Sequence, residues 1–139
     1  LLDLSMKYCD SSIVIYRTWI ADWGDLNREQ ITDKISLLMQ KDDPAWRERN
    51  FDKIFSRRVE NTVTAQIETP RRLSVSFTNR GTLWRHMMKP DSALLSYEKA
   101  LALWKENRTA ESNLNVLMGG EPLKTSLIES LFPPDRKQR

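Results

Sequence analysis

Cysteine, glycine and long apolar runs are scarce in this chain, and each shortage excludes a class of protein. The single cysteine, Cys9, excludes an internal disulfide framework and is typical of a reducing compartment, so we expect a cytoplasmic protein. Four glycines in 139 residues, with little β-branched alternation, disfavour a sheet connected by tight turns. No apolar run approaches the roughly 20 residues that a membrane span needs, so we expect no membrane partner.

Motifs that carry catalysis are also lacking. The one histidine, His86, and Cys9 lie 77 residues apart and belong to no recognised nucleophile–base or zinc pattern. The stretch "MGGEP" has two glycines but lacks the Lys-Ser/Thr of a phosphate loop. The acidic stretch around Asp42 and Asp43 lacks the spacing of a calcium loop. We therefore expect no enzyme, no catalytic residue, no bound metal and no cofactor.

The net charge of +3 is unevenly distributed along the chain. Residues 1–43 hold 5 Lys/Arg and 8 Asp/Glu, residues 44–90 hold 10 and 4, and residues 91–139 hold 7 of each. A basic middle segment suits an acidic partner or a nucleic acid, although the solvated face of a helix often carries similar charge.

Two arginine pairs lie within the basic segment. Arg57-Arg58 and Arg71-Arg72 flank residues 66–70, which we expect to form a connection. If that connection brings the pairs together, they form one basic patch, and they are the candidate nucleic-acid-binding residues.

The apolar pattern predicts an all-α fold with short connections. We expect helices over residues 1–8, 13–22, 26–40, 44–66, 71–88, 90–106, 109–118 and 121–132. Ile31, Ile35 and Leu38 mark the buried face of the third of these helices. Leu73, Val75 and Phe77 also fit the period of a strand, but no second strand lies nearby to pair with them, so helix is favoured there.

Turn and cap residues set the expected helix boundaries. The stretch "DSS" at 10–12 is the expected N-cap of the second helix, and Gly24 its left-handed C-cap. Asp25 and Asp43 are the expected N-caps of the third and fourth helices. Pro70 is expected to stop the fourth helix, because the residue before a proline is pushed out of the α region.

Small residues occur at regular intervals where the helices 71–88 and 90–106 would face each other. The residues at the characteristic spacing are Phe77, Gly81, Trp84, Ala93, Tyr97 and Ala100. This pattern resembles the tetratricopeptide repeat, with Arg80 in place of the family's leucine and Lys105 in place of its proline. The resemblance covers residues 74–107 well and 108–132 weakly, and it implies antiparallel helical hairpins packed closely at Gly81.

The resemblance also implies a function. It implies a non-enzymatic protein–protein interaction module, an adaptor or scaffold, whose groove holds a peptide or helix of another protein. The candidate partner-binding residues are Thr78, Thr82, Arg85, Ser112 and Val116. Of these, Arg85 supplies a positive charge for a carboxylate or an acidic segment of the partner.

Three parts of the chain are expected: a helical part at 1–70 without family match, hairpins at 71–132 and a polar tail at 133–139. The first residue is not methionine, so we expect a piece of a larger protein, such as a bacterial multidomain protein. The alternatives to an interaction module are a basic helical domain that binds nucleic acid and a structural subunit of a permanent assembly.

Overall fold

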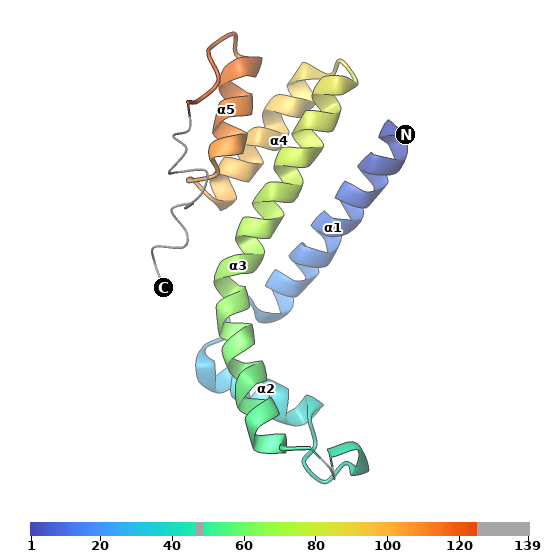
Figure 1. The fold of residues 1–139 in the computed structure, drawn as a ribbon, viewed down its shortest axis with the longest axis vertical. Coiled ribbons are helices and arrows are strands. Elements are labelled where there is room, and N and C mark those ends of the chain that lie inside the picture. Colours follow the sequence, from blue (N-terminus) through green and yellow to red (C-terminus); the bar gives the residue numbers. More distant parts are fainter. Residues whose placement is uncertain (47–48, 125–139) are drawn as a thin grey trace.

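The fold consists of packed helices (Figure 1). The computed structural model describes residues 1–46 and 49–124, and no strand occurs among them. The elements are α1 (Leu2–Trp23), α2 (Arg28–Leu38), the 3₁₀ helix η1 (Pro44–Trp46), α3 (Phe51–His86), α4 (Pro90–Leu103) and α5 (Arg108–Leu117). The all-α prediction is confirmed. None of the helices described is both long enough and apolar enough to cross a membrane.

The long helix α3 organises the molecule, because it contacts every other α-helix. Figure 1 shows α1 and α4 running antiparallel to α3 beside its C-terminal half, and α5 beside α4. The short helix α2 lies instead against the N-terminal half of α3. One helix therefore joins two packing regions.

Each region has its own hydrophobic core. The upper core joins α1, α3, α4 and α5 through Ile13, Leu73, Phe77, Ala100 and Ala110. The lower core joins α2 to the start of α3 through Ile31, Ile35, Met39 and Val59. The lower core also includes aromatic rings, with Phe51 packed edge-on against Trp46 and stacked on Phe55.

The prediction of two helices within residues 1–22 was wrong, because α1 is continuous through the serines. Ser11 Oγ donates to the Lys7 carbonyl at 2.8 Å, and Ser12 Oγ donates to the Cys9 carbonyl at 2.8 Å. The hydroxyls thus bond inside a helix instead of capping a new one. Gly24 does follow the end of α1, but with φ −60° and ψ −41° it is right-handed and not the predicted left-handed cap.

The third predicted helix exists with different ends. Asn27, not Asp25, caps α2, and its side chain forms a reciprocal capping box with Gln30. Ile31 and Ile35 are buried as predicted, whereas Leu38 is 68% exposed. The helix ends at Leu38, and the non-helical backbone of Met39 (φ −118°, ψ 81°) brings the Met39 side chain into the core in place of Leu38.

The predicted helix over 44–66 starts later than expected. Asp43 does cap a turn by accepting from the Ala45 N–H at 2.9 Å, but that turn is only the three-residue η1. Helix α3 begins at Phe51, where the Asn50 side chain accepts from the Lys53 N–H at 3.1 Å.

The largest correction concerns Pro70, which lies inside α3 and does not end it. A proline in a helix interior cannot donate to the carbonyl four residues earlier and costs roughly 3 kcal/mol. Thr69 and Leu73 on either side are buried, so packing of α3 in the upper core offsets this cost. Figure 1 shows α3 bending near its middle, as a helix does at a proline.

Most of the C-terminal predictions hold, but the start of the last predicted helix is wrong. Residues 71–88 fall in α3 and its end, while α4 and α5 match the helices predicted at 90–106 and 109–118. Residues 121–124 are not helical. The rest of the predicted helix 121–132 and the tail 133–139 lie outside the described residues.

Candidate functional site

The hairpin of α3 and α4 closes as tightly as its small residues predict. Ala93, Tyr97 and Ala100 of α4 are completely buried. A Cβ atom added at Gly81 would lie 2.6 Å from Cε1 of Tyr97, closer than real Cβ atoms come. The ring of Tyr97 therefore fills the space that a side chain at position 81 would need, and only glycine fits there.

Two of the predicted partner-binding residues, Thr78 and Thr82, take part in an internal hydrogen-bond network. Thr78 is 2% exposed, and its Oγ1 donates to the Ser74 carbonyl and accepts from Asn107 Nδ2 at 3.0 Å. Thr82 Oγ1 lies 3.2 Å from the Tyr97 hydroxyl and 3.4 Å from Asn113 Nδ2. Their side chains thus join α3 to α4 and α5, and Thr78 offers no surface to another molecule.

The other three predicted residues lie nearer the surface. Arg85 is half-buried in the last turn of α3, and Val116 of α5 is 40% exposed. Ser112 is half-buried, and its Oγ accepts from the Leu123 N–H at 3.1 Å. Partner binding by these residues stays a prediction.

A groove lies on the seam between α1 and α3, and we call it the α1–α3 groove. Its lower hollow, of about 240 Å³, is lined by Trp19, Trp23, Ile35, Leu38, Arg58, Asn61, Thr62 and Ala65. Its upper hollow, of about 350 Å³, is lined by Ile15, Tyr16, Trp19, Asn61, Thr64, Ala65, Glu68, Thr69 and Arg72. The two hollows share Trp19, Asn61 and Ala65, so they adjoin each other along the seam, and the α1–α3 groove means this pair of hollows.

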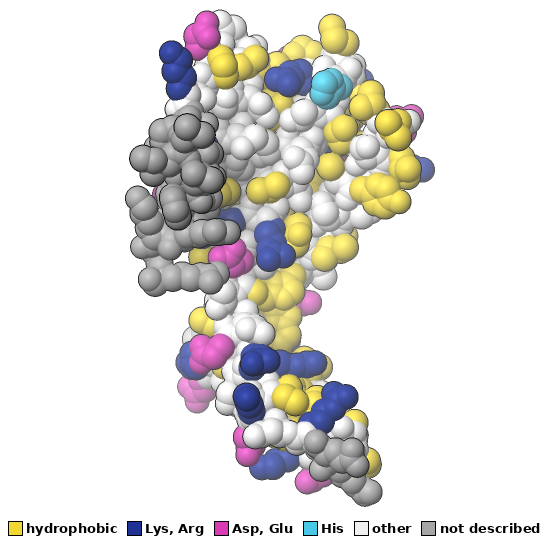
Figure 2. Space-filling model, viewed as in Figure 1, with side chains coloured by type: hydrophobic (Ala, Val, Ile, Leu, Met, Phe, Trp, Pro, Cys, Tyr) yellow, Lys and Arg dark blue, Asp and Glu magenta, His cyan; other side chains and the backbone are white. Residues whose placement is uncertain are grey.

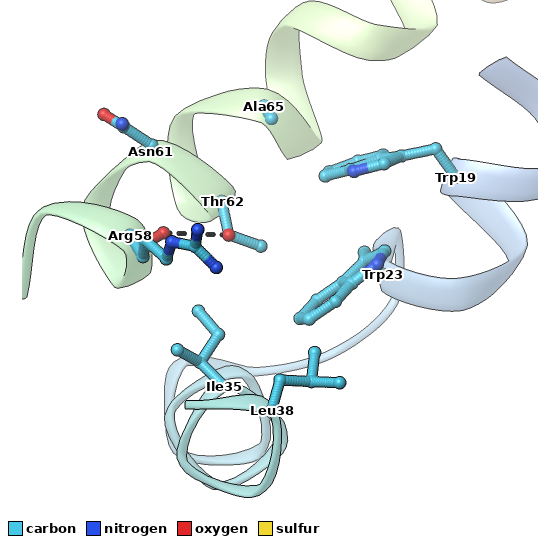
Figure 3. Close-up of a pocket in the computed structure, with 8 residues that line it drawn as sticks. All are labelled: Trp19, Trp23, Ile35, Leu38, Arg58, Asn61, Thr62 and Ala65. Atoms are coloured by element: carbon cyan, nitrogen blue, oxygen red, sulfur yellow. Dashed lines mark hydrogen bonds between the residues drawn. The ribbon is translucent and has the colours of Figure 1, made fainter. Parts of the chain in front are cut away.

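Tryptophan and aliphatic side chains form the apolar part of this groove. Figure 3 shows the rings of Trp19 and Trp23 projecting from α1 toward α3, with Ile35 and Leu38 pointing in from α2. Leu38 is 68% exposed and Ile15, in the upper hollow, is 65% exposed. Such exposed apolar side chains beside a hollow are a common feature of binding sites.

The α3 wall of the groove is positively charged. Arg58 and Arg72, two of the four predicted basic residues, line the lower and upper hollows and are exposed. Neither forms an ion pair with another residue in the described ranges. Glu68 also lines the groove, but it lies 3.9 Å from Arg71, measured from Oε1 to Nη1.

The predicted patch of two adjacent arginine pairs does not form. The 66–70 connection expected between the pairs is helix, so 14 residues of α3 separate Arg58 from Arg72, which is roughly 21 Å at 1.5 Å per residue. Arg57 is exposed beside the groove, and Arg71 lies over the ring of Trp104 at 5.8 Å. Figure 2 shows Asp and Glu side chains among the Lys and Arg around α2 and the start of α3.

The one cysteine lies on α1, half-buried and close to the Arg80–Asp10 ion pair. Burial raises the pKa of the Cys9 thiol, the carboxylate of Asp10 raises it further, and Arg80 lowers it. Cys9 therefore remains a neutral thiol at neutral pH and is a poor nucleophile. His86 is exposed at the end of α3, and no group of three metal-ligating side chains lies together in the described residues.

The sequence predictions missed the α1–α3 groove, although α1 carries a signal for it. Leu4, Tyr8, Ile15 and Trp19 fall at i, i+4, i+11 and i+15 and form a second apolar stripe beside the buried one. Figure 2 shows apolar side chains along the edge of the molecule that α1 forms. Treating 1–8 and 13–22 as separate helices hid the continuity of this stripe.

No family model, no curated protein and no solved structure matches this chain.

Proposed function

We propose that this protein is a non-enzymatic protein–protein interaction module that binds a helix or peptide of another protein in the α1–α3 groove. The observation that supports this function is a pair of adjoining open hollows, with Trp19 lining both and the exposed side chains of Leu38 and Ile15 lining the lower and upper one. Tryptophan is enriched among the residues that dominate binding energy, and apolar grooves between helices receive amphipathic segments.

The hairpin of α3 and α4 supports the groove from behind. Its contact at Gly81 and the Ser74–Asn107–Thr78 hydrogen bonds hold α3 firmly against α4 and α5. A rigid α3 lowers the entropy cost of binding, because the wall of the groove is already in place. In this proposal the tetratricopeptide-like hairpin is a scaffold, and kinship with that family remains a proposal that rests on residues 74–107.

Two matched pairs of variants test this function. Ile15 and Leu38 line the groove, whereas their neighbours Val14 and Leu37 are comparably exposed, at 63% and 78%, and do not line it. The immobilised protein is incubated with a nuclease-treated extract of the cells that make it. We expect a discrete protein to be retained by wild type, Val14→Ala and Leu37→Ala, and to be lost with Ile15→Ala and Leu38→Ala.

Two results would contradict this assignment. Equal retention by all four variants, combined with loss in Arg85→Ala, would move the binding site to the α3–α5 side. Retention of no discrete protein by the wild type would remove the interaction function itself. A permanent assembly would be recognised by an unfolding midpoint that depends on protein concentration.

Nucleic-acid binding is the second candidate, and one observation favours it. Arg57, Arg58 and Arg72 are all exposed on α3 without an ion pair to a described residue. Phosphate binding weakens steeply with salt, with a log–log slope of about −0.7 per neutralised phosphate of a single strand. A steep salt slope that is reduced in Arg58→Gln and unchanged in Leu38→Ala would support this candidate over the protein partner.

A further inference from the structure

We infer that the occupant of the α1–α3 groove is an acidic amphipathic helix of about four turns, with carboxylates that reach Arg58 and Arg72. This inference rests on the proposed function and specifies the partner that the groove would take. It combines two features of the groove: the apolar wall, and the two arginines with the distance between them.

The two walls of the groove differ in character. Ile15 and Trp19 of α1 form an apolar wall, and Leu38 extends it at the lower end. The α3 wall is polar, with Asn61, Thr64 and Ala65 in its middle, so the side chains there are short enough for a backbone to approach. A segment that is apolar on one face and polar on the other matches both walls.

The charges of the groove specify an acidic partner. The charged side chains that line it are Arg58, Glu68 and Arg72, and Glu68 already has Arg71 beside it. Arg58 and Arg72 have no carboxylate partner in the described residues. Because arginine pairs well with planar carboxylates, acidic side chains on the occupant would form ion pairs with these two arginines.

The separation of the two arginines specifies the length of the occupant. A helix lying along α3 spans the roughly 21 Å between Arg58 and Arg72 with about 14 residues, or four turns. A nucleic acid fits less well, because its phosphates repeat every few ångströms, whereas the groove offers positive charge at its two ends and Glu68 between them.

Three fluorescein-labelled helical peptides of about 18 residues test the inference. All three carry the same apolar stripe; the first has two glutamates about 14 residues apart, the second has lysines at those positions, and the third has glutamates about 7 residues apart. Fluorescence anisotropy measures their binding to the whole protein at low salt. We expect the widely spaced glutamate peptide to bind at least about tenfold more tightly than the lysine peptide, and more tightly than the closely spaced one.

Variants of the protein assign the effect to the two arginines. Arg58→Gln and Arg72→Gln should each weaken the widely spaced glutamate peptide by about fivefold, the upper end for an exposed ion pair. Neither should weaken the lysine peptide. Arg57→Gln is the matched control, since Arg57 is exposed beside Arg58 but does not line the groove.

The possible failures can be told apart. If all three peptides bind equally and Ile15→Ala weakens each of them, the groove function stands and the acidic partner is wrong. If no peptide binds, or if binding ignores Ile15→Ala and Leu38→Ala, the groove function itself is wrong. If a single-stranded oligonucleotide binds more tightly than the peptides and its binding depends on Arg58 and Arg72, the occupant is a nucleic acid. If sedimentation shows a dimer that Ile15→Ala dissociates, the occupant is a second copy of this chain.

Discussion

Gly81 and Tyr97 form a close contact between α3 and α4 that depends on a single residue, the glycine. The Tyr97 ring is fully buried, and its hydroxyl lies 3.2 Å from Thr82 Oγ1, so it cannot retreat into solvent. Close packing at Gly81 was predictable, because small residues in the two helices occur at the spacing of a tight hairpin. The sequence could not identify Tyr97 as the side chain that fills the gap, because that depends on how the helices are rotated.

Substitution of Gly81 should reduce the free energy of unfolding. Alanine gains about 0.8–1 kcal/mol of helix propensity, but a Cβ at 2.6 Å from the ring causes overpacking that costs about 1–3 kcal/mol. We expect a net loss of about 1 kcal/mol for Gly81→Ala and a larger loss for Gly81→Leu. Urea unfolding followed by circular dichroism measures both.

Asn79→Ala is the control for this pair, because Asn79 is exposed on the same helix two residues earlier. It should leave the free energy of unfolding within about 0.5 kcal/mol of wild type. If Gly81→Leu had the same free energy of unfolding as the wild type, the hairpin would not be closely packed at Tyr97.

Cys9 provides a test of the electrostatics around α1. Its raised pKa means that iodoacetamide should modify the folded protein more slowly at neutral pH than it modifies a free thiol, and faster as the pH rises. Asp10→Asn removes a charge that raises the pKa and should speed the reaction, whereas Arg80→Gln removes a charge that lowers it and should slow it. Mass spectrometry measures the rates, and rates that change in the same direction would contradict the assigned causes.

The raised pKa of Cys9 also makes the free energy of unfolding depend on pH. Because the pKa of Cys9 is raised in the folded state, the folded protein holds the thiol proton more tightly than the unfolded chain does. This contribution to stability is fully present below the pKa of the unfolded thiol and is lost as the pH rises through the folded value.

At the scale of elements, α3 and α1 show where local sequence rules fail. Pro70 and the serines at 11 and 12 are ordinary boundary signals, yet both helices continue through them. In α1, the side-chain hydrogen bonds of the serines are made inside the helix, and Ser12 Oγ also lies 2.9 Å from Ser76 Oγ of α3. Residues of other helices, such as Ser76 beside Ser12, contribute to this continuity, and a boundary signal read from the local segment does not contain them.

Replacing Pro70 should stabilise the protein and disturb the groove. Pro70→Ala restores a donor for the Gln66 carbonyl and removes a cost of about 3 kcal/mol, while the unfolded chain gains about 0.4–1 kcal/mol of entropy. We expect a net gain of about 2 kcal/mol in the free energy of unfolding. Because Pro70 lies between Ala65 and Arg72, a straighter α3 should also shift one end of the groove and weaken binding of the widely spaced glutamate peptide.

Urea unfolding and peptide anisotropy measure these two effects on the same variant. Ile67→Ala is the control, since Ile67 is 60% exposed on the same helix and does not line the groove. A loss of stability in Pro70→Ala would mean that the bend is needed for one helix to pack in both cores.

At the scale of the whole molecule, the groove lies where the two cores meet. The upper core takes Leu73 and Phe77 from α3 and the lower core takes Val59, and the segment between them lines the groove. The sequence predicted the hairpin part of the upper core, with Phe77 and Ala100, because a hairpin is local and its small residues are regularly spaced. It did not predict the groove, which brings together residues of α1, α2 and α3 that are far apart in the chain.

This arrangement makes the lower half of the groove depend on the lower core. Ile31 is completely buried there, and Ile31→Ala should cost about 2–4 kcal/mol. Helix α2 packs mainly against the start of α3, away from α4 and α5, so we expect the loss to appear as local opening. Hydrogen exchange should quicken in α2 and in the first turns of α3, while amides of α4 and α5 keep their protection.

Binding should follow the same division, because Leu38 and Arg58 lie on the lower half of the groove and Ile15 and Arg72 on the upper half. Ile31→Ala should therefore make binding of the widely spaced glutamate peptide insensitive to Arg58→Gln while Arg72→Gln still weakens it. Leu37→Ala, at an exposed position of α2, should change neither exchange nor binding. Equal loss of protection in all helices would show instead that the continuous α3 couples the two cores into one cooperative unit. In that case neither Arg58→Gln nor Arg72→Gln would weaken peptide binding in the Ile31→Ala background.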